Sequence, residues 1–145
     1  MMFLTKLMEK RGLVLSEVYD IIIVGGGPAG LSAGVYGSRS RLKTAILQKG
    51  KPGGQAATTQ DLENYPGFSR GTTGPALMEA MAEHAKSFGT EIIREEVIDL
   101  ELDGEVKVLK GKSGKEYLAK TVILAPGAEP RSLNIKGERA LRGKG

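Results

Sequence analysis

A glycine-rich segment between an apolar run and a small-residue stretch holds the residues most able to do chemistry. Three glycines have the spacing G-x-G-x-x-G and directly follow the apolar residues 21–24. In this pattern the first glycine permits a tight turn off a strand, the second lets a pyrophosphate approach the backbone, and the third lets a helix pack closely. The N-terminus of the following helix favours phosphate. The sequence therefore predicts a dinucleotide site, rather than a plain turn, at Gly25, Gly27, Pro28, Ala29 and Gly30.

A second candidate contact lies at the end of the next predicted strand. Residues 28–39 read as a helix with Pro28 in its first turn, and residues 42–47 read as a strand, which completes a βαβ unit. In NAD-binding versions an acidic residue about 20 positions beyond the glycines binds the ribose hydroxyls. This chain has Gln48 there. An amide can still hydrogen-bond a hydroxyl, but the missing acid weakens the interpretation as a plain NAD site.

Residues 50–74 form a long polar segment without clear periodicity. Such a length is uncommon inside a compact domain unless the segment has a function. Its Gly, Thr, Gln and Asn residues offer the neutral hydrogen bonds that a flat polar ring needs. An ordinary surface loop would have the same composition, so both interpretations stay open here.

The later elements predict the rest of the architecture. A helix starts around Thr73, buries a stripe from Leu77 to Phe88 and ends at Gly89. Residues 91–94 read as a strand, a meander turning at Asp103-Gly104 follows through residues 116–119, and residues 121–125 form a separate apolar strand. We therefore expect an α/β fold, a Rossmann-like three-layer domain with an inserted antiparallel β-meander.

Composition narrows the function classes. The 145 residues suit one domain, and the net charge of +4 is scattered, which argues against nucleic acid as a partner. There is no cysteine, so this polypeptide alone has no dithiol, disulfide or iron–sulfur chemistry. No apolar run is long enough for a membrane helix, and residues 1–18 read as an N-terminal extension, not a secretory signal. We expect a cytoplasmic protein with no metal site and no catalytic side chain; His84 is interpreted as structural or exposed.

Several motifs together resemble the low-molecular-weight thioredoxin reductases, over nearly the whole stretch 19–145. They are GGGPAG at 25–30, PGGQ at 52–55, the Thr58-Thr59 pair, ENYPG at 63–67, GPALME at 74–79 and VILAPGAEPR at 122–131. The resemblance implies an FAD-dependent oxidoreductase of the pyridine nucleotide-disulfide superfamily, with the FAD pyrophosphate at residues 25–30. Around the rest of FAD it implies Gln48 and Lys49 at the adenosine ribose, Val97 at the adenine, Gly54, Gln55, Thr59 and Asn64 along the flavin, and Gly127 at a nearby turn.

The resemblance also implies what lies outside these residues. In this family electrons pass from NADPH through FAD to a Cys-x-x-Cys pair and then to thioredoxin. We expect residues 19–145 to be the N-terminal part of the FAD-binding domain, incomplete at the C-terminus, with the NADPH domain and its cysteines absent. The chain would then be the FAD-binding portion of a thioredoxin-reductase-like flavoprotein and would not complete the reaction alone. Its expected partners are FAD, a second chain supplying the missing domain, a thioredoxin-like protein and further copies of itself.

Two alternatives remain open, a stand-alone FAD- or nucleotide-binding module without catalysis and a simple NAD(P)-dependent Rossmann dehydrogenase. One departure concerns the cofactor directly. Where the family usually has Ala-Thr-Gly, this chain has Ala125-Pro126-Gly127. Proline removes a backbone donor and a hydroxyl at that turn.

Overall fold

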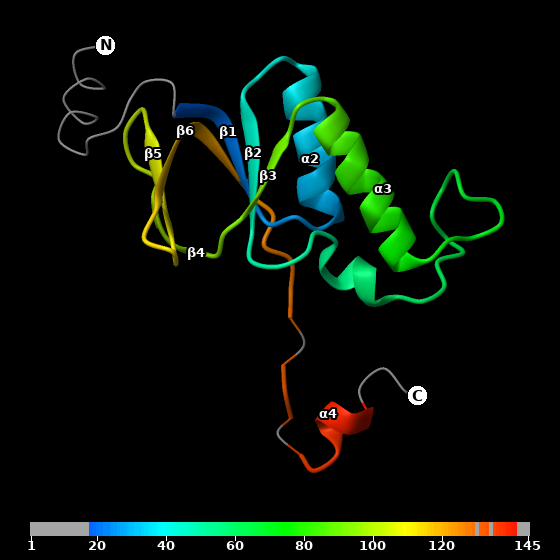
Figure 1. The fold of residues 1–145 in the computed structure, drawn as a ribbon. Helices are drawn as coiled ribbons and strands as arrows, with labels where there is room; N and C mark the ends of the chain where they lie inside the picture. The colour runs from blue at the N-terminus through cyan, green and yellow to red at the C-terminus, as the bar shows by residue number, and fades with distance from the viewer. Residues whose placement is uncertain (1–17, 130, 134, 142–145) are drawn as a thin grey trace.

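The computed structural model describes residues 18–129, 131–133 and 135–141 (Figure 1). In this part of the chain the strands are β1 (Val18–Val24), β2 (Thr44–Gln48), β3 (Glu91–Arg94), β4 (Val97–Glu101), β5 (Lys107–Gly111) and β6 (Glu116–Leu124). The helices are α2 (Pro28–Arg39), the 3-10 helix η2 (Gly54–Thr58), α3 (Gly74–Ser87) and α4 (Glu138–Leu141). The strands form one sheet in the order β3-β2-β1-β6-β5-β4. Strands β3, β2, β1 and β6 are parallel, whereas β6, β5 and β4 are antiparallel.

The centre of the parallel sheet is covered on both faces, which is why Ile22 and Ile23 of β1 and residues 45–47 of β2 are apolar and buried. Successive side chains of a strand point to opposite faces. Ile23 therefore packs with the side chains of α2 and α3, whereas its neighbour Ile22 packs with Leu109 of β5. The helices, the parallel strands and the meander thus form the three layers that the sequence predicts (Figure 1).

Strand β6 connects the parallel strands to the meander. Its first residues pair antiparallel with β5, and most of its length pairs parallel with β1, from Leu118 to Leu124. The expectation of two separate strands at residues 116–119 and 121–125 is wrong. Lys120, which interrupts the apolar pattern, stays in the strand and forms an ion pair with Asp20 of β1 at 2.6 Å. An exposed, charged side chain within the sequence of β6 therefore did not mark a strand boundary.

Helix α3 follows the predicted pattern closely. The Thr73 hydroxyl accepts a hydrogen bond from the backbone N–H of Ala76 at 3.3 Å, which caps the helix. Gly89, with φ +98°, follows the last turn in the left-handed conformation that favours glycine. One detail of the predicted stripe is wrong, because Phe88 is 42% exposed. Phe88 is the C-cap residue, and its ring packs beside His84 with the ring centres 5.5 Å apart.

The segment between β2 and α3 is more ordered than its sequence suggests. It contains η2, and Leu62 and Thr72 form an isolated antiparallel bridge that closes the loop between them.

The two ends of the described chain differ from each other. Val18, which we assigned to the N-terminal extension, is the first residue of β1; the rest of that predicted extension lies outside the described residues. After β6 the chain leads away from the sheet to α4, and Leu133, Ile135 and Leu141 on this stretch are exposed (Figure 1).

Candidate functional site

The glycine-rich turn after β1 brings three chain segments close together. A Cβ on Gly25 would lie 2.1 Å from the carbonyl oxygen of Ala125, and Gly25 has φ +106°. A Cβ on Gly30 would lie 1.8 Å from the Gly25 carbonyl oxygen, so α2 starts directly against the turn. Gly27 differs, because a Cβ there would have no atom within 4 Å. Two of the glycines therefore permit close packing, and the third faces open space.

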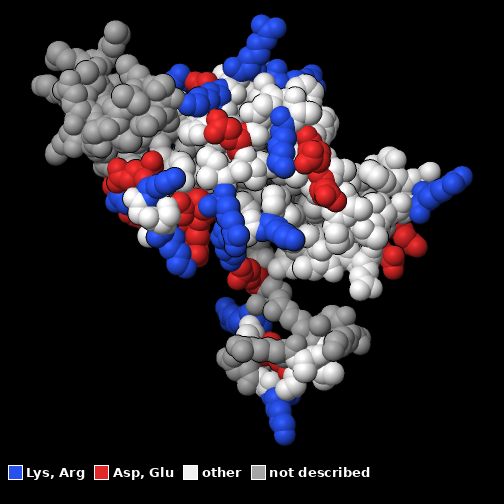
Figure 2. All heavy atoms as spheres, in the orientation of Figure 1, with Lys and Arg blue, Asp and Glu red and all other residues white. Residues whose placement is uncertain are grey.

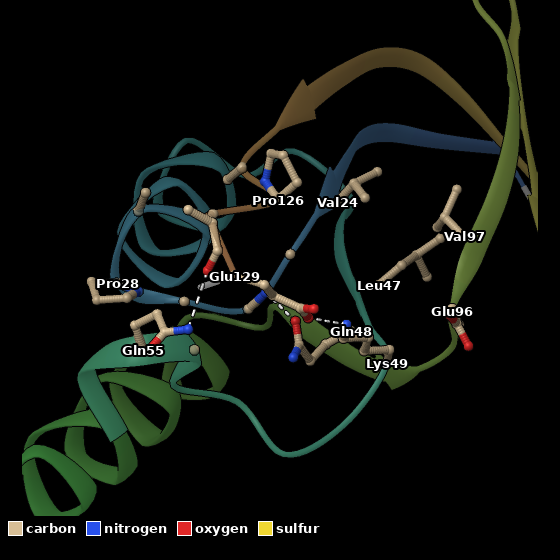
Figure 3. Close-up of a pocket in the computed structure, with 18 of the residues that line it drawn as sticks. Val24, Pro28, Leu47, Gln48, Lys49, Gln55, Glu96, Val97, Pro126 and Glu129 are labelled. Carbon is tan, nitrogen blue, oxygen red and sulfur yellow. Dashed lines mark hydrogen bonds and ion pairs between the residues drawn. The ribbon is translucent and has the colours of Figure 1, made fainter. Parts of the chain in front are cut away.

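That open space is a cavity of about 640 Å³ beyond the carboxyl ends of β1, β2 and β6 (Figure 3). Ligands of open parallel sheets bind at this edge. Five short segments line the cavity: the glycine turn, the end of β2, the start of η2, the corner between β3 and β4, and the residues after β6. The cavity therefore runs from the N-terminus of α2 to the first residue of β4, Val97.

Besides backbone hydrogen bonds, three side-chain contacts join the walls of this cavity (Figure 3). The side-chain oxygen of Gln48 accepts a hydrogen bond from the backbone N–H of Gly26 at 2.6 Å. The side-chain amide of Gln55 donates to the carbonyl oxygen of Ala128 at 3.2 Å. Lys49 forms an ion pair with Glu129, whose hydrogen bond and charge raise the pKa of the lysine above its usual value. The walls are thus held by the side chains that also face the cavity.

A buried carboxylate fixes the corner between β3 and β4. Glu95 accepts hydrogen bonds from the hydroxyl and the backbone N–H of Ser113 and from the Tyr117 hydroxyl, the last at 3.2 Å. The Ser113 hydroxyl contributes most to lowering the pKa of Glu95 below its usual value. Gly111 leaves room for this carboxylate, since a Cβ there would lie 2.4 Å from the Glu95 carboxyl carbon. The backbone leading to Val97 is therefore anchored to the turn between β5 and β6.

Most of the predicted site residues lie together around this cavity. They are Gly25, Gly27, Pro28, Ala29, Gln48, Lys49, Gly54, Gln55, Val97 and Gly127. Gly30, a residue of α2, is buried beneath the glycine turn. Thr59 and Asn64 do not line the cavity: the Thr59 carbonyl accepts a hydrogen bond from Gly74 N–H at 2.9 Å, and Asn64 lines a separate surface hollow formed by residues 63–69. Whether each of these residues contacts a cofactor stays a prediction.

The sequence reasoning missed several lining residues. Gly26, Ala56, Glu95, Glu96, Ala128 and Glu129 all line the cavity. Gly26 and Glu129 stand inside motifs that the sequence displays, so their neighbours could have indicated them. Glu95 and Glu96 immediately precede Val97, but only the three-dimensional structure shows that the corner turns toward the glycine residues.

Pro126 does not interrupt the pairing with β1. The last hydrogen bond between β6 and β1 runs from Ala125 N–H to the Val24 carbonyl at 2.9 Å. Pro126 follows that bond and is exposed. The missing N–H therefore falls just beyond the last residue that pairs with β1.

The shape and the polar groups of the cavity suit an extended dinucleotide. The open space at Gly27 lies next to the N-terminus of α2, where the N–H groups of the first turn favour phosphate.

Among the described residues, no three or more acidic or histidine side chains gather as they would around a metal ion. Over the same residues, no helix is long and apolar enough to cross a membrane. On the face drawn in Figure 2, lysine and arginine side chains are interspersed with acidic ones.

Comparison with known proteins identifies relatives of the whole described fold. The thioredoxin reductase of Peptoclostridium acidaminophilum is 48% identical over 131 residues, which are 90% of this chain and 41% of the relative. The thioredoxin reductase of Bacillus subtilis (strain 168) is 48% identical over 130 residues, or 89% of this chain and 40% of the relative. The crystal structure of thioredoxin reductase from Streptococcus pyogenes MGAS5005 superposes with a TM-score of 0.80 at 42% identity, over 86% of this chain and 40% of that one.

These comparisons cover nearly all of this chain but only part of each relative. The chain spans about two fifths of the length of the thioredoxin reductases that it matches. The part that it matches is the N-terminal, FAD-binding region of these proteins. The family model described as pyridine nucleotide-disulphide oxidoreductase matches residues 19–145. The chain therefore belongs to the pyridine nucleotide-disulphide oxidoreductase family, as a partial, thioredoxin-reductase-like member.

Proposed function

We propose that the cavity at the carboxyl ends of β1, β2 and β6 binds FAD. The observation that carries this proposal is the open space at Gly27, because a Cβ on Gly25, Gly26 or Gly30 would meet protein atoms within 3.4 Å and a Cβ on Gly27 would meet none within 4 Å. A pyrophosphate placed there would meet the first turn of α2, where backbone N–H groups favour anions. The cavity then continues past Gln48 and Lys49 to Val97, in the direction that an adenosine would need.

Each wall has its own part in this proposal. Gln48 and Lys49 would contact the ribose hydroxyls, and the backbone at Val97 would meet the adenine. Gly54 and Gln55, at the start of η2, would face the flavin end. Thr59 and Asn64 belong to the proposal only as contacts beyond the cavity, because both lie outside its lining.

Bound FAD would supply hydride and electron transfer, while the protein binds and orients it. In the whole protein we infer electron flow from NAD(P)H through FAD to a disulfide, with NADPH and the redox cysteines held by a second domain or chain. A thioredoxin-like protein would then be the electron acceptor. A cytoplasmic location and self-association are part of the same proposal. Membership of the pyridine nucleotide-disulphide oxidoreductase family argues against the alternative of a simple NAD(P)-dependent dehydrogenase.

The test begins with the visible absorption spectrum of the purified chain, before and after addition of FAD. We expect an oxidised-flavin spectrum and saturable quenching of flavin fluorescence. Reduction by NADPH is then measured with and without a separate Cys-x-x-Cys domain, and we expect reduction only when that domain is present. A chain that takes up no FAD contradicts the proposal. A chain that takes up FAD but is never reduced supports the second candidate, a binding module, which the absence of cysteine favours.

A further inference from the structure

We propose that Glu129 competes with the dinucleotide for Lys49, so that cofactor binding requires the lysine to exchange this carboxylate for the adenosine ribose of the cofactor. This inference rests on the proposed FAD function and adds an autoinhibitory contact to that site. Lys49 follows β2, and Glu129 lies five positions beyond the last residue of β6, so their ion pair joins two walls of the cavity. Figure 3 shows both side chains among those that line it.

The position of Glu129 is fixed by more than one contact. We call residues 125–129 the strap. Gln55 donates a hydrogen bond to the Ala128 carbonyl on the strap, next to Glu129. Ala125 N–H is bonded to Val24 at the other end of the strap. The strap therefore presents the Glu129 carboxylate toward Lys49 across the cavity from the β6 side.

The charges of the lining residues show why Lys49 is the residue for which Glu129 and the cofactor would compete. Among the described residues that line the cavity, Lys49 is the sole cation, and Glu95, Glu96 and Glu129 are the anions. Glu95 is engaged by Ser113 and Tyr117, and Glu96 forms an ion pair with Lys112 at 2.8 Å. An anionic dinucleotide thus meets one lysine in the cavity, and that lysine is held by the third carboxylate.

The expected effect is small but measurable. The Lys49 and Glu129 side chains are 59% and 74% exposed, and ion pairs at such exposed sites are weak. Removing the competing carboxylate should therefore tighten cofactor binding by about two- to fivefold. Simple repulsion between Glu129 and the phosphates would act in the same direction, so a single variant does not separate the two explanations.

A double-mutant cycle separates them. FAD affinity is measured by flavin fluorescence for the unmodified chain, Glu129→Gln, Lys49→Met and the double variant, at low ionic strength. Competition predicts that Glu129→Gln tightens binding only while Lys49 is present, and changes it by less than about 1.5-fold in the Lys49→Met background. Repulsion alone predicts equal or greater tightening in that background, since no lysine then shields the carboxylate.

Glu83→Gln is the matched control, because Glu83 also forms an exposed ion pair, with Lys86 of α3 at 3.2 Å, and does not line the cavity. We expect it to leave FAD affinity unchanged. If all variants bind FAD and Glu129→Gln is no tighter than the unmodified chain, the competition is refuted while the FAD function stands. If no variant binds FAD, both fail together. Binding by Glu129→Gln alone would support both, with a stronger competition than expected.

Discussion

Substituting Gly27 with alanine should impair cofactor binding and leave the fold intact. Gly30→Ala should instead destabilise the fold. Gly27 is the N-cap of α2 with φ −78°, a value that alanine adopts without strain. Its added methyl group would meet no protein atom within 4 Å and would point into the cavity. At Gly30 the same group would lie 1.8 Å from the Gly25 carbonyl oxygen. One methyl group therefore tests the site, and the other tests the packing of the turn.

The magnitudes follow from these distances. For Gly27→Ala, a weaker N-cap costs a few tenths to about 1 kcal/mol, and a less flexible unfolded chain returns about 0.4–1 kcal/mol. The net change in unfolding free energy should stay within about 0.5 kcal/mol. A methyl group forced between the turn and a bound pyrophosphate should cost about 1–3 kcal/mol, or roughly 5- to 150-fold in affinity. For Gly30→Ala, overpacking against a backbone atom should cost about 1–3 kcal/mol or more of stability.

Thermal unfolding of both variants without FAD, followed by FAD titration, checks this reasoning. A loss of 1 kcal/mol in a domain of this size lowers Tm by roughly 3–4 °C. We expect no more than about 2 °C for Gly27→Ala and a clearly larger decrease for Gly30→Ala. Two results would refute the argument: Gly27→Ala binding FAD as tightly as the unmodified chain, or the two variants losing equal stability.

Three further predictions concern polar groups of the fold. Thr90→Val should cost about 1–3 kcal/mol in denaturant unfolding, because the Thr90 hydroxyl bonds the buried Ser38 hydroxyl at 2.8 Å, which would lose this partner. The pKa of Glu95 is lowered in the folded state, so the carboxylate stabilises the fold fully above pH 4.5, its usual pKa, and this stabilisation is lost as the pH falls below 4.5. Glu95→Gln should therefore make the free energy of unfolding depend less on pH in that acidic range. Burial, and then the Glu91 hydrogen bond, raise the pKa of Tyr19 from 10.0 to about 12, so its contribution is complete below pH 10.0 and is lost on the way to about 12. Tyr19→Phe should remove that alkaline loss, measured as Tm against pH.

Helix α2, strand β3 and the position of the glycine turn could be predicted from the sequence, because local signals are enough to recognise them. The predicted helix at residues 28–39 matches α2 residue for residue, and its glycine turn lies where the pattern indicates. The strand at residues 91–94 is likewise confirmed. These elements are fixed by apolar runs and by glycine or proline at their ends, so no distant contact was needed to recognise them.

Most of the remaining errors came from contacts between distant residues. Periodicity within β6 breaks at Lys120, and only pairing with β1 shows that the strand continues. The lining residues Glu95 and Glu129 are brought to one cavity by the corner after β3 and by the strap. Glu95 carries no local signal for that position, whereas Glu129 stands inside the motif at residues 122–131. The polar loop hid η2, because a short 3-10 helix has no amphipathic pattern to detect.

The late position of β6 in the sequence has a consequence for synthesis on the ribosome. β1 lies in the middle of the sheet, but one of its two neighbours is β6, and the bond from Lys120 to Asp20 spans 100 positions. Until residue 124 has left the exit tunnel, one edge of β1 has no partner strand, and unpaired strand edges promote association with other chains. The cavity also lacks its strap during that interval. We therefore expect nascent chains that stop before β6 to aggregate and to bind no cofactor, whereas β2 and β3 can already pair beside β1.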